Sequence, residues 1–188
     1  MPRRLTGVAG FDDAPFAPGA GGKVQVVGTV YAGLHLNGVL VGEVEQDGQD
    51  GAEQLAVMLE RSRFAPVVQL VMLQGIALGG FNVVDPFFLE QRLARPVLVV
   101  SRKLPDLPAI REALLTKVPG GWEKWALIER LGPMEPVGRL HVQRVGLTLE
   151  EAAGVVQRFA IEGWMPEPLR VAHLIAGALV KGQSRGRA

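Results

Sequence analysis

The chain has 188 residues, which is enough for one domain of ordinary size with a hydrophobic core. Apolar residues make up 48% and charged residues 21%, the balance of a globular protein, which excludes an intrinsically disordered chain. The net charge of +1 excludes an overall attraction to nucleic acid or anionic lipid, and the absence of cysteine excludes disulfides, thiolate metal sites and a cysteine nucleophile.

The start of the chain does not have the pattern of a secretory signal, because residues 5–11 are too short and too rich in glycine for an apolar signal region. No run reaches the roughly 18 apolar residues of a membrane span. We therefore expect a cytoplasmic protein without membrane contact. We also expect a single domain over residues 1–182 and a flexible basic tail over residues 183–188.

Three strands are expected in the first quarter of the chain, at residues 7–11, 24–31 and 34–44. Asn37-Gly38 is the strongest short hairpin signal in this region, and Ala32-Gly33 competes with it as the turn. With either turn, the three strands form an antiparallel meander.

The rest of the chain alternates between helix and strand patterns. Further strands are expected at residues 67–73, 97–100 and 139–145. Helices are expected at residues 51–63, 85–93, 105–118, 122–132, 148–161 and 166–180. Asp50 is placed to cap the first helix, and Thr148 with Glu151 forms a capping box at the fifth. This order predicts an α/β domain with a mixed sheet, in which an antiparallel meander is followed by parallel strands and helices cover the faces.

Acidic residues follow the expected strands and are the leading candidates for chemistry: Asp12, Asp13, Asp47 and Asp50. Strand ends are where an open α/β sheet places its site, and carboxylates from separate loops can bind a hard cation such as Mg²⁺ or Mn²⁺. A turn and a helix cap are the plainer interpretations of Asp47 and Asp50. Asp12 and Asp13 are interpreted as functional, because two adjacent acids repel each other unless something positive lies between them.

Basic residues at two positions could hold a phosphate backbone. Arg63 follows the first helix, where it also suits the helix dipole. Arg102 and Lys103 follow the expected strand 97–100, and if the strands are parallel they lie at the same sheet edge as the acids. The dipole role is the alternative for Arg63, and a solvated face is the alternative for Arg102 and Lys103.

Histidine and tryptophan are interpreted as structural. The three histidines, His35, His141 and His173, have no paired spacing for a zinc site, and His173 in the apolar last helix is expected to be packed or half-buried. The tryptophans could stack on bases, but this residue in amphipathic helices more often belongs to the core: Trp122, Trp125 and Trp164.

Four stretches of the sequence resemble the endonuclease dU family: "GFDDAPF" at 10–16, "DGQDGAEQLAVMLERSRF" at 47–64, "LQGIALGGFNVVD" at 73–85 and "PVLVVSRKLPD" at 96–106. The match extends in order over the first two-thirds of the chain. This resemblance implies a ribonuclease H-like fold related to endonuclease V. It also implies hydrolysis of a phosphodiester with Mg²⁺ or Mn²⁺, and DNA containing deoxyuridine as the substrate.

The resemblance assigns metal-binding and catalytic roles to Asp12 or Asp13 at the first strand and to Asp47 and Asp50 in the second motif. Gln74 lies where related sequences usually have aspartate. Its amide oxygen can still bind magnesium, but it brings no negative charge. In the glycine-rich turn that follows, Phe81 could stack on a flipped base and Asn82 could read its edge.

Two other hypotheses remain open from the sequence. The first is a nucleic-acid-binding module without catalysis, in which Arg63, Arg102 and Lys103 hold phosphate. The second is a structural or interaction protein whose acids only form turns. RNA as an alternative substrate, and a homodimer formed through the apolar last helix, are also open.

Overall fold

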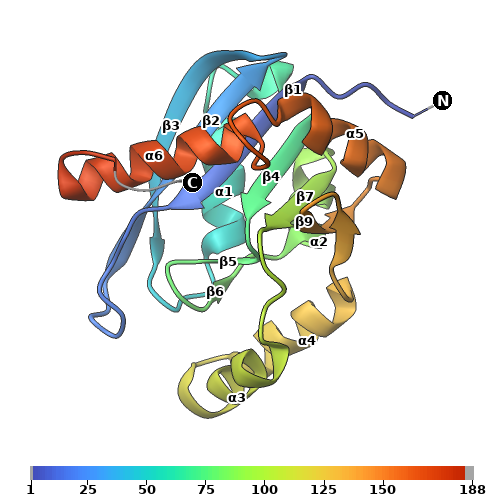
Figure 1. Ribbon diagram of the computed structural model, residues 1–188. Coiled ribbons are helices and arrows are strands. Elements are labelled where there is room, and N and C mark those ends of the chain that lie inside the picture. The colour runs from blue at the N-terminus through green and yellow to red at the C-terminus, as the bar shows by residue number, and fades with distance from the viewer. Residues whose placement is uncertain (1, 185–188) are drawn as a thin grey trace.

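The computed structural model describes residues 2–184. A seven-stranded sheet lies at its centre, in the order β3-β2-β1-β4-β7-β9-β8, with helices on both faces (Figure 1). The three central strands are parallel to one another: β1 (Gly7–Asp13), β4 (Leu70–Gln74) and β7 (Val97–Ser101). They are buried on both faces over nearly their whole length, as their apolar sequences predict.

The outer strands of the sheet are antiparallel. On one side, β2 (Lys23–Ala32) and β3 (His35–Glu45) form the predicted meander with β1. On the other side, β9 (Leu140–Val145) pairs with β7, and the short β8 (Glu135–Val137) pairs with β9. A separate two-stranded hairpin, β5 (Ala77–Leu78) and β6 (Asn82–Val83), follows β4.

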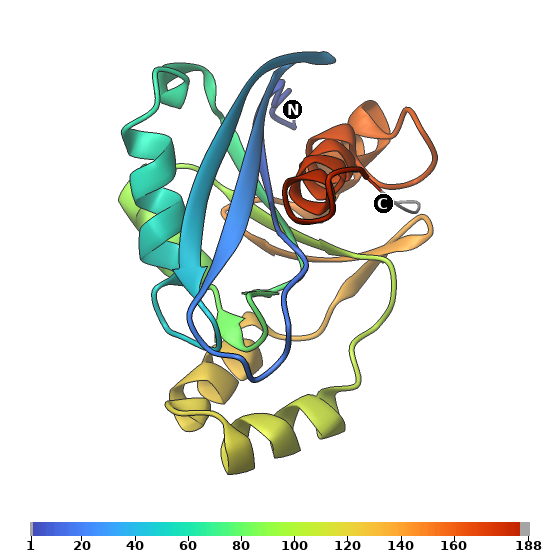
Figure 2. The same cartoon turned by 90° about the vertical axis from the view of Figure 1, so that its left-hand side faces the viewer.

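Six α-helices and one 3₁₀ turn, η1 (Ala65–Val67), complete the described part of the chain. The α-helices are α1 (Gly51–Glu60), α2 (Pro86–Leu93), α3 (Leu107–Lys117), α4 (Gly121–Leu131), α5 (Leu149–Phe159) and α6 (Glu167–Lys181). The helices α1 and α2 cover one face of the sheet and α5 and α6 cover the other, while α3 and α4 form a hairpin beyond the sheet (Figures 1 and 2). No helix within residues 2–184 is long and apolar enough to cross a membrane.

Alternation along the strands divides the core into two layers. In β1, Ala9 and Phe11 pack in the layer under α1 and α2, whereas Val8 packs in the layer under α5 and α6. Gly10 also faces α6, and a Cβ atom at this position would lie 2.7 Å from the carbonyl carbon of Pro168. Glycine therefore lets α6 lie directly on β1.

Several predicted boundaries need correction. The hairpin turn lies at Gly33, whose φ of 58° suits glycine, and Asn37 lies inside β3 at a register shift in its pairing with β2. The first helix ends at Glu60 and not at Arg63, and residues 67–69 are not part of β4. The sequence does not predict β5, β6 and β8, because strands of two or three residues have almost no periodicity.

The tryptophans are not all core residues. Trp125 is buried, but Trp122 and Trp164 are 66% and 57% exposed, and Trp164 lies in the loop between α5 and α6 and not in a helix. The predicted basic tail lies largely outside the described residues, which end at residue 184.

Candidate functional site

The carboxyl ends of β1, β4 and β7 meet at one edge of the sheet, because these strands are parallel. Phe11 pairs with Leu73, so Asp12 lies one residue further, at the level of Gln74. Val8 and Met72 face the layer under α5 and α6, and Asp12 and Gln74 follow them at an even spacing. The register therefore places the Asp12 carboxylate and the Gln74 amide side by side on the α6 face.

Asp12 is bonded to a histidine of the last helix. Its Oδ2 lies 2.7 Å from His173 Nδ1, and the residue is only 4% exposed. The contact raises the pKa of His173, chiefly through the hydrogen bond to the Asp12 carboxylate. A buried carboxylate and a half-exposed imidazole thus form a pair at the strand ends.

The sequence interpretation expected His173 to be packed or half-buried, and it did not foresee this partner. The helix α6 buries Leu169, Ala172 and Ala176 against the sheet, and His173 lies beside that stripe, at its margin. Its place at the margin of an apolar face was visible in the sequence. The sequence did not show which strand end the helix would cross.

Gln74 has an unusual electrostatic environment. Its Oε1 atom is buried and has no hydrogen-bond partner, a feature shared by Trp125 Nε1 and His141 Nδ1 within residues 2–184. Of these three, only Gln74 is at the strand level of Asp12. An unpaired buried amide oxygen costs about 1–3 kcal/mol, and it is available to a donor or a cation.

Asp13 points toward the glycine-rich turn after β5. Its Oδ2 accepts a hydrogen bond of 2.7 Å from Gly79 N. Burial, and next the charge of Asp12, raise the pKa of Asp13 to about 6. The two adjacent acids therefore differ in role: one is paired with an imidazole, and the other is a weakened acid held by the backbone.

Asp47 holds the same turn from the other side. Its Oδ1 accepts from Phe81 N at 2.7 Å, and its own amide donates to Gly79 O at 2.9 Å. Its backbone is left-handed, with a φ of 54°. A Cβ on Gly80 would lie 2.3 Å from Asp47 Oδ1, so this turn requires glycine. The structure thus brings Asp13 and Asp47 to opposite sides of one glycine-rich turn.

Asp50 is bonded elsewhere, to the fully buried Asn82. Asp50 Oδ1 accepts from Asn82 Nδ2 at 2.7 Å and from Glu45 N at 3.0 Å. Asn82 also donates to Glu45 O and accepts from Gly51 N. Asp50 is at the N-cap position of α1, but its side chain makes no cap hydrogen bond, which corrects the predicted capping role.

Asp13, Asp47 and Asp50 accept hydrogen bonds from the segment 79–82, whereas Asp12 is bonded to His173. Within residues 2–184, no group of three or more Asp, Glu, His or Cys side chains is arranged to hold a metal ion. The predicted metal set of Asp12, Asp13, Asp47 and Asp50 is therefore not assembled at one point.

The predicted substrate-binding residues lie in different places. Arg102 and Lys103 follow β7 at the same edge as Asp12. The hydrogen bond to Asp12 raises the pKa of His173, and the positive charge of Arg102 offsets a part of this rise. Arg63 follows the far end of α1 and lies 4.9 Å over the ring of Phe64.

The two residues predicted to contact a base belong to the segment 79–82. Phe81 is partly buried against the cluster around Trp125. Base contact by Asn82 would require this buried side chain to leave the hydrogen bonds described above.

The model of one protein family, described as Endonuclease dU, matches residues 4–180. The chain belongs to the endonuclease dU family. A UPF0215 protein of Deinococcus radiodurans is 50% identical over 184 residues, which cover 98% of this chain and 94% of the relative. A UPF0215 protein of Methanothermobacter thermautotrophicus is 40% identical, over 96% of this chain and 91% of the relative.

Solved structures support the predicted fold of this endonuclease dU family member. A protein of Archaeoglobus fulgidus has a TM-score of 0.86 at 35% identity, covering 94% of this chain and 99% of that one. Endonuclease V of Ciona intestinalis, solved with a DNA that contains an inosine, has a TM-score of 0.63 at 13% identity and covers 95% and 87%. The predicted ribonuclease H-like fold is confirmed, and it is similar to the fold of endonuclease V.

Proposed function

We propose that this protein is a divalent-metal-dependent endonuclease that hydrolyses a phosphodiester bond in DNA containing deoxyuridine. The membership of the endonuclease dU family supports a nuclease activity. The observation that carries the proposal is the pair of buried groups at the central strand ends, the Asp12 carboxylate and the unpartnered Gln74 Oε1. Predicted activity on RNA, self-association and a cytoplasmic location stay predictions.

The donor chemistry at this edge fits a hard cation. Asp12 has a second carboxylate oxygen besides the one bonded to His173, and Gln74 adds an amide oxygen that has no hydrogen-bond partner within residues 2–184. Asp13 can add charge once it loses its proton. When bound there, Mg²⁺ or Mn²⁺ would activate a water molecule and stabilise the departing oxygen. Asp47 and Asp50 would instead hold the segment 79–82 in place.

The chain's own residues have distinct roles in this proposal. Asp12 fixes the orientation of His173, and with Nδ1 directed at the carboxylate, Nε2 is left to exchange a proton with solvent or substrate. Arg102 and Lys103, at the same edge, hold phosphates of the bound strand. Gln74 contributes an oxygen without charge, which predicts weaker metal binding than an aspartate would give.

The family description supports DNA containing deoxyuridine as the proposed substrate, and a physical reason adds to this support. A uracil base is cheaper to unstack when it is mispaired, so an enzyme at an open sheet edge can select it by extrusion. Incubation of a labelled duplex with one deoxyuridine, in Mn²⁺ and in EDTA, tests this directly. We expect a nick only in Mn²⁺ and only in the deoxyuridine strand, and cleavage of a matched thymidine duplex at the same rate would contradict the substrate.

A nucleic-acid-binding protein without catalysis is the second candidate. It is favoured because residues 2–184 contain no group of three or more His, Cys, Asp or Glu side chains arranged to hold a metal ion. Gln74→Asp separates the two. Cleavage by the parent protein supports the nuclease, whereas cleavage only by Gln74→Asp identifies an inactivated nuclease that still binds DNA.

A further inference from the structure

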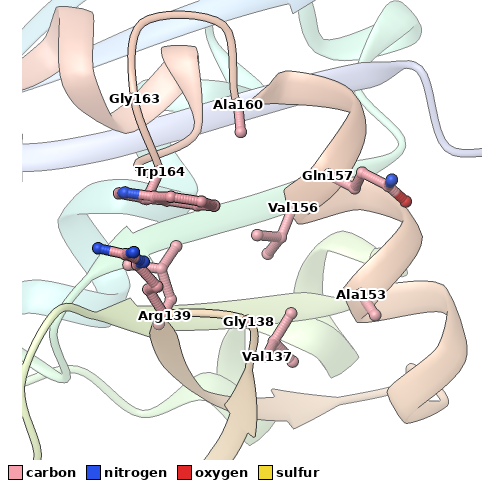
Figure 3. Close-up of a pocket in the computed structure, with 10 residues that line it drawn as sticks. Val137, Gly138, Arg139, Ala153, Val156, Gln157, Ala160, Gly163 and Trp164 are labelled. Carbon is pink, nitrogen blue, oxygen red and sulfur yellow. The ribbon is translucent and has the colours of Figure 1, made fainter.

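A cavity of about 430 Å³ lies between the β8–β9 turn, one side of α5 and the loop before α6 (Figure 3). Its volume is in the range of small-ligand sites. Ten residues line it: Val137, Gly138, Arg139, Leu140, Ala153, Val156, Gln157, Ala160, Gly163 and Trp164. Arg139 is the only charged side chain among these ten, and Trp164 is the only aromatic one.

Trp164 and Arg139 form a stacked pair at this cavity. The guanidinium carbon of Arg139 lies 4.6 Å from the centre of the Trp164 ring, and Figure 3 shows the ring edge-on above the arginine. Trp164 is nevertheless 57% exposed. A tryptophan that only fixed the loop would be expected to bury most of its ring, so much of this aromatic surface is free for a ligand.

The chemistry of the pair matches a nucleotide. A planar base gains stacking energy on an exposed indole, and a fixed guanidinium favours the adjacent phosphate. The apolar side chains of Val137, Leu140 and Val156 complete a wall suited to a flat, uncharged ring. A cationic or purely aliphatic ligand would not use both Arg139 and Trp164.

The position of the cavity relates it to the strand-end site. Leu140, Val156 and Met165 pack in the layer under α5 and α6, which is the face that carries Asp12 and His173. Ser101 pairs with His141, so β9 begins at the edge where β7 ends. Three strand spacings of about 4.8 Å separate β1 from β9, or about 14 Å in all. About four stacked nucleotides at ~3.4 Å each cover this span.

We infer that the Trp164–Arg139 cavity is a nucleotide subsite, in which an unpaired base of the bound strand stacks on Trp164 while Arg139 contacts its phosphate. The inference rests on the proposed nucleic-acid substrate, and it assigns a binding element outside the strand-end acids. The subsite acts on affinity and not on the chemical step.

Binding in EDTA tests the subsite without cleavage. The probe is a short fluorescein-labelled oligothymidylate, measured by anisotropy with the parent protein, Trp164→Leu and Trp164→Tyr. We expect Trp164→Leu to weaken binding about tenfold, as the loss of one stacked base does, and Trp164→Tyr to retain most of the affinity. Trp122→Leu is the matched control, since Trp122 is also largely exposed but lies on α4, and it should change affinity less than twofold.

The outcomes distinguish the subsite from the nuclease. Equal affinities for the parent protein and Trp164→Leu, or equal affinities for the Leu and Tyr variants, would overturn the subsite even if the parent cleaves DNA. A Trp164-dependent affinity in a parent that never cleaves would support the subsite and remove the nuclease. Arg139→Gln should weaken binding and flatten its salt dependence, and an unchanged salt dependence would count against the phosphate contact.

Discussion

Gln74 shows how a single residue sets the electrostatic balance of the strand-end site. It ends β4 beside Asp12, with a buried oxygen that has no partner in the described structure. An aspartate there would add a charge next to the buried Asp12 carboxylate, which is unfavourable without a cation and favourable with one. We therefore expect the folded protein to need a cation at this position less than a variant with aspartate would.

We predict that Gln74→Asp lowers the melting temperature in EDTA and increases the rise that Mn²⁺ produces. Ligand at about a hundred times its Kd stabilises by about 2.7 kcal/mol, and a chain of this size gains roughly 2–4 °C per kcal/mol. Thermal unfolding with and without Mn²⁺ measures both effects. Gln25→Asp, at an exposed position on β2, is the control and should show neither. An identical response of both variants to Mn²⁺ would contradict a cation site at Gln74.

Asp13 makes stability depend on pH at the same edge. Its pKa is raised from 3.8 to about 6, because burial and the neighbouring Asp12 disfavour the charged form. The folded protein therefore keeps a proton that the unfolded chain has already released between about pH 4 and pH 6. Stability falls as pH rises through this window. The Asp12–His173 pair affects stability at higher pH. Its stabilising contribution is complete below the pKa that His173 has in the unfolded chain, and it is lost as the pH rises through the raised pKa of His173 in the folded protein.

We predict that Asp13→Asn removes the fall in stability between pH 4 and pH 6. The asparagine oxygen can still accept from Gly79 N, so the turn is kept. At pH 8 the variant should exceed the parent protein by on the order of 2–3 kcal/mol, at about 1.4 kcal/mol per unit of pKa shift, and at pH 4 the two should agree. Urea unfolding across this pH range measures it, with the exposed Glu162→Gln as control. If the free energies of unfolding of the parent protein and the variant changed with pH in parallel, the raised pKa assigned to the buried Asp13 would be refuted.

At the scale of elements, the last helix assembles the candidate site. The helix α6 crosses β1 so closely that Gly10 has no room for a side chain, and it carries His173 to Asp12. A hydroxyl from β2 fixes the same crossing, because Thr29 Oγ1 donates to Pro168 O at 2.6 Å. On the other face, Lys124 of α4 donates to Asp47 O at 2.6 Å and connects the α3–α4 hairpin to the glycine-rich turn.

Two glycine-to-alanine substitutions should change the free energy of unfolding in opposite directions. Gly10→Ala pushes Pro168 and α6 away from β1, and overpacking of this kind costs about 1–3 kcal/mol. Gly177 lies within α6, and the described structure leaves open space for a Cβ there beyond the helix's own backbone. Gly177→Ala should therefore stabilise the protein by about 0.5–1 kcal/mol through helix propensity. Chemical denaturation gives both values, and the His173 pKa by NMR should fall toward its ordinary value only in Gly10→Ala. Equal effects of the two changes would show that the helix crossing does not depend on Gly10.

At the scale of the whole molecule, the meander, the parallel central strands and the two helical layers could be predicted from the sequence. Buried strands and capping boxes are local signals, as with Thr148 and Glu151, whose reciprocal cap is present. The site could be predicted only in part, because strand order places Asp12 beside Gln74 but does not reveal where distant elements cross. His173 comes from 161 residues further along the chain, and no local pattern gives its partner.

The same limit applies to the roles of Asp47 and Asp50. The sequence allows two roles for Asp47 and Asp50, as metal ligands after a strand or as a turn residue and a helix cap. Their oxygens accept hydrogen bonds from Phe81 N and from Asn82, which lie more than thirty residues away. A turn acid and a metal ligand have the same sequence signature. In the folded loop, both acids accept hydrogen bonds from other parts of the chain.

The rate of Mn²⁺-dependent cleavage of a deoxyuridine duplex, compared between Asp12→Asn and Asp50→Asn, tests the proposed reaction centre most directly. We predict that Asp12→Asn loses at least about a hundredfold in rate, because a metal site supplies several kcal/mol of transition-state stabilisation, while Asp50→Asn stays within about threefold of the parent protein. Equal losses in the two variants, with both proteins folded, would contradict a reaction centre built on Asp12 and Gln74.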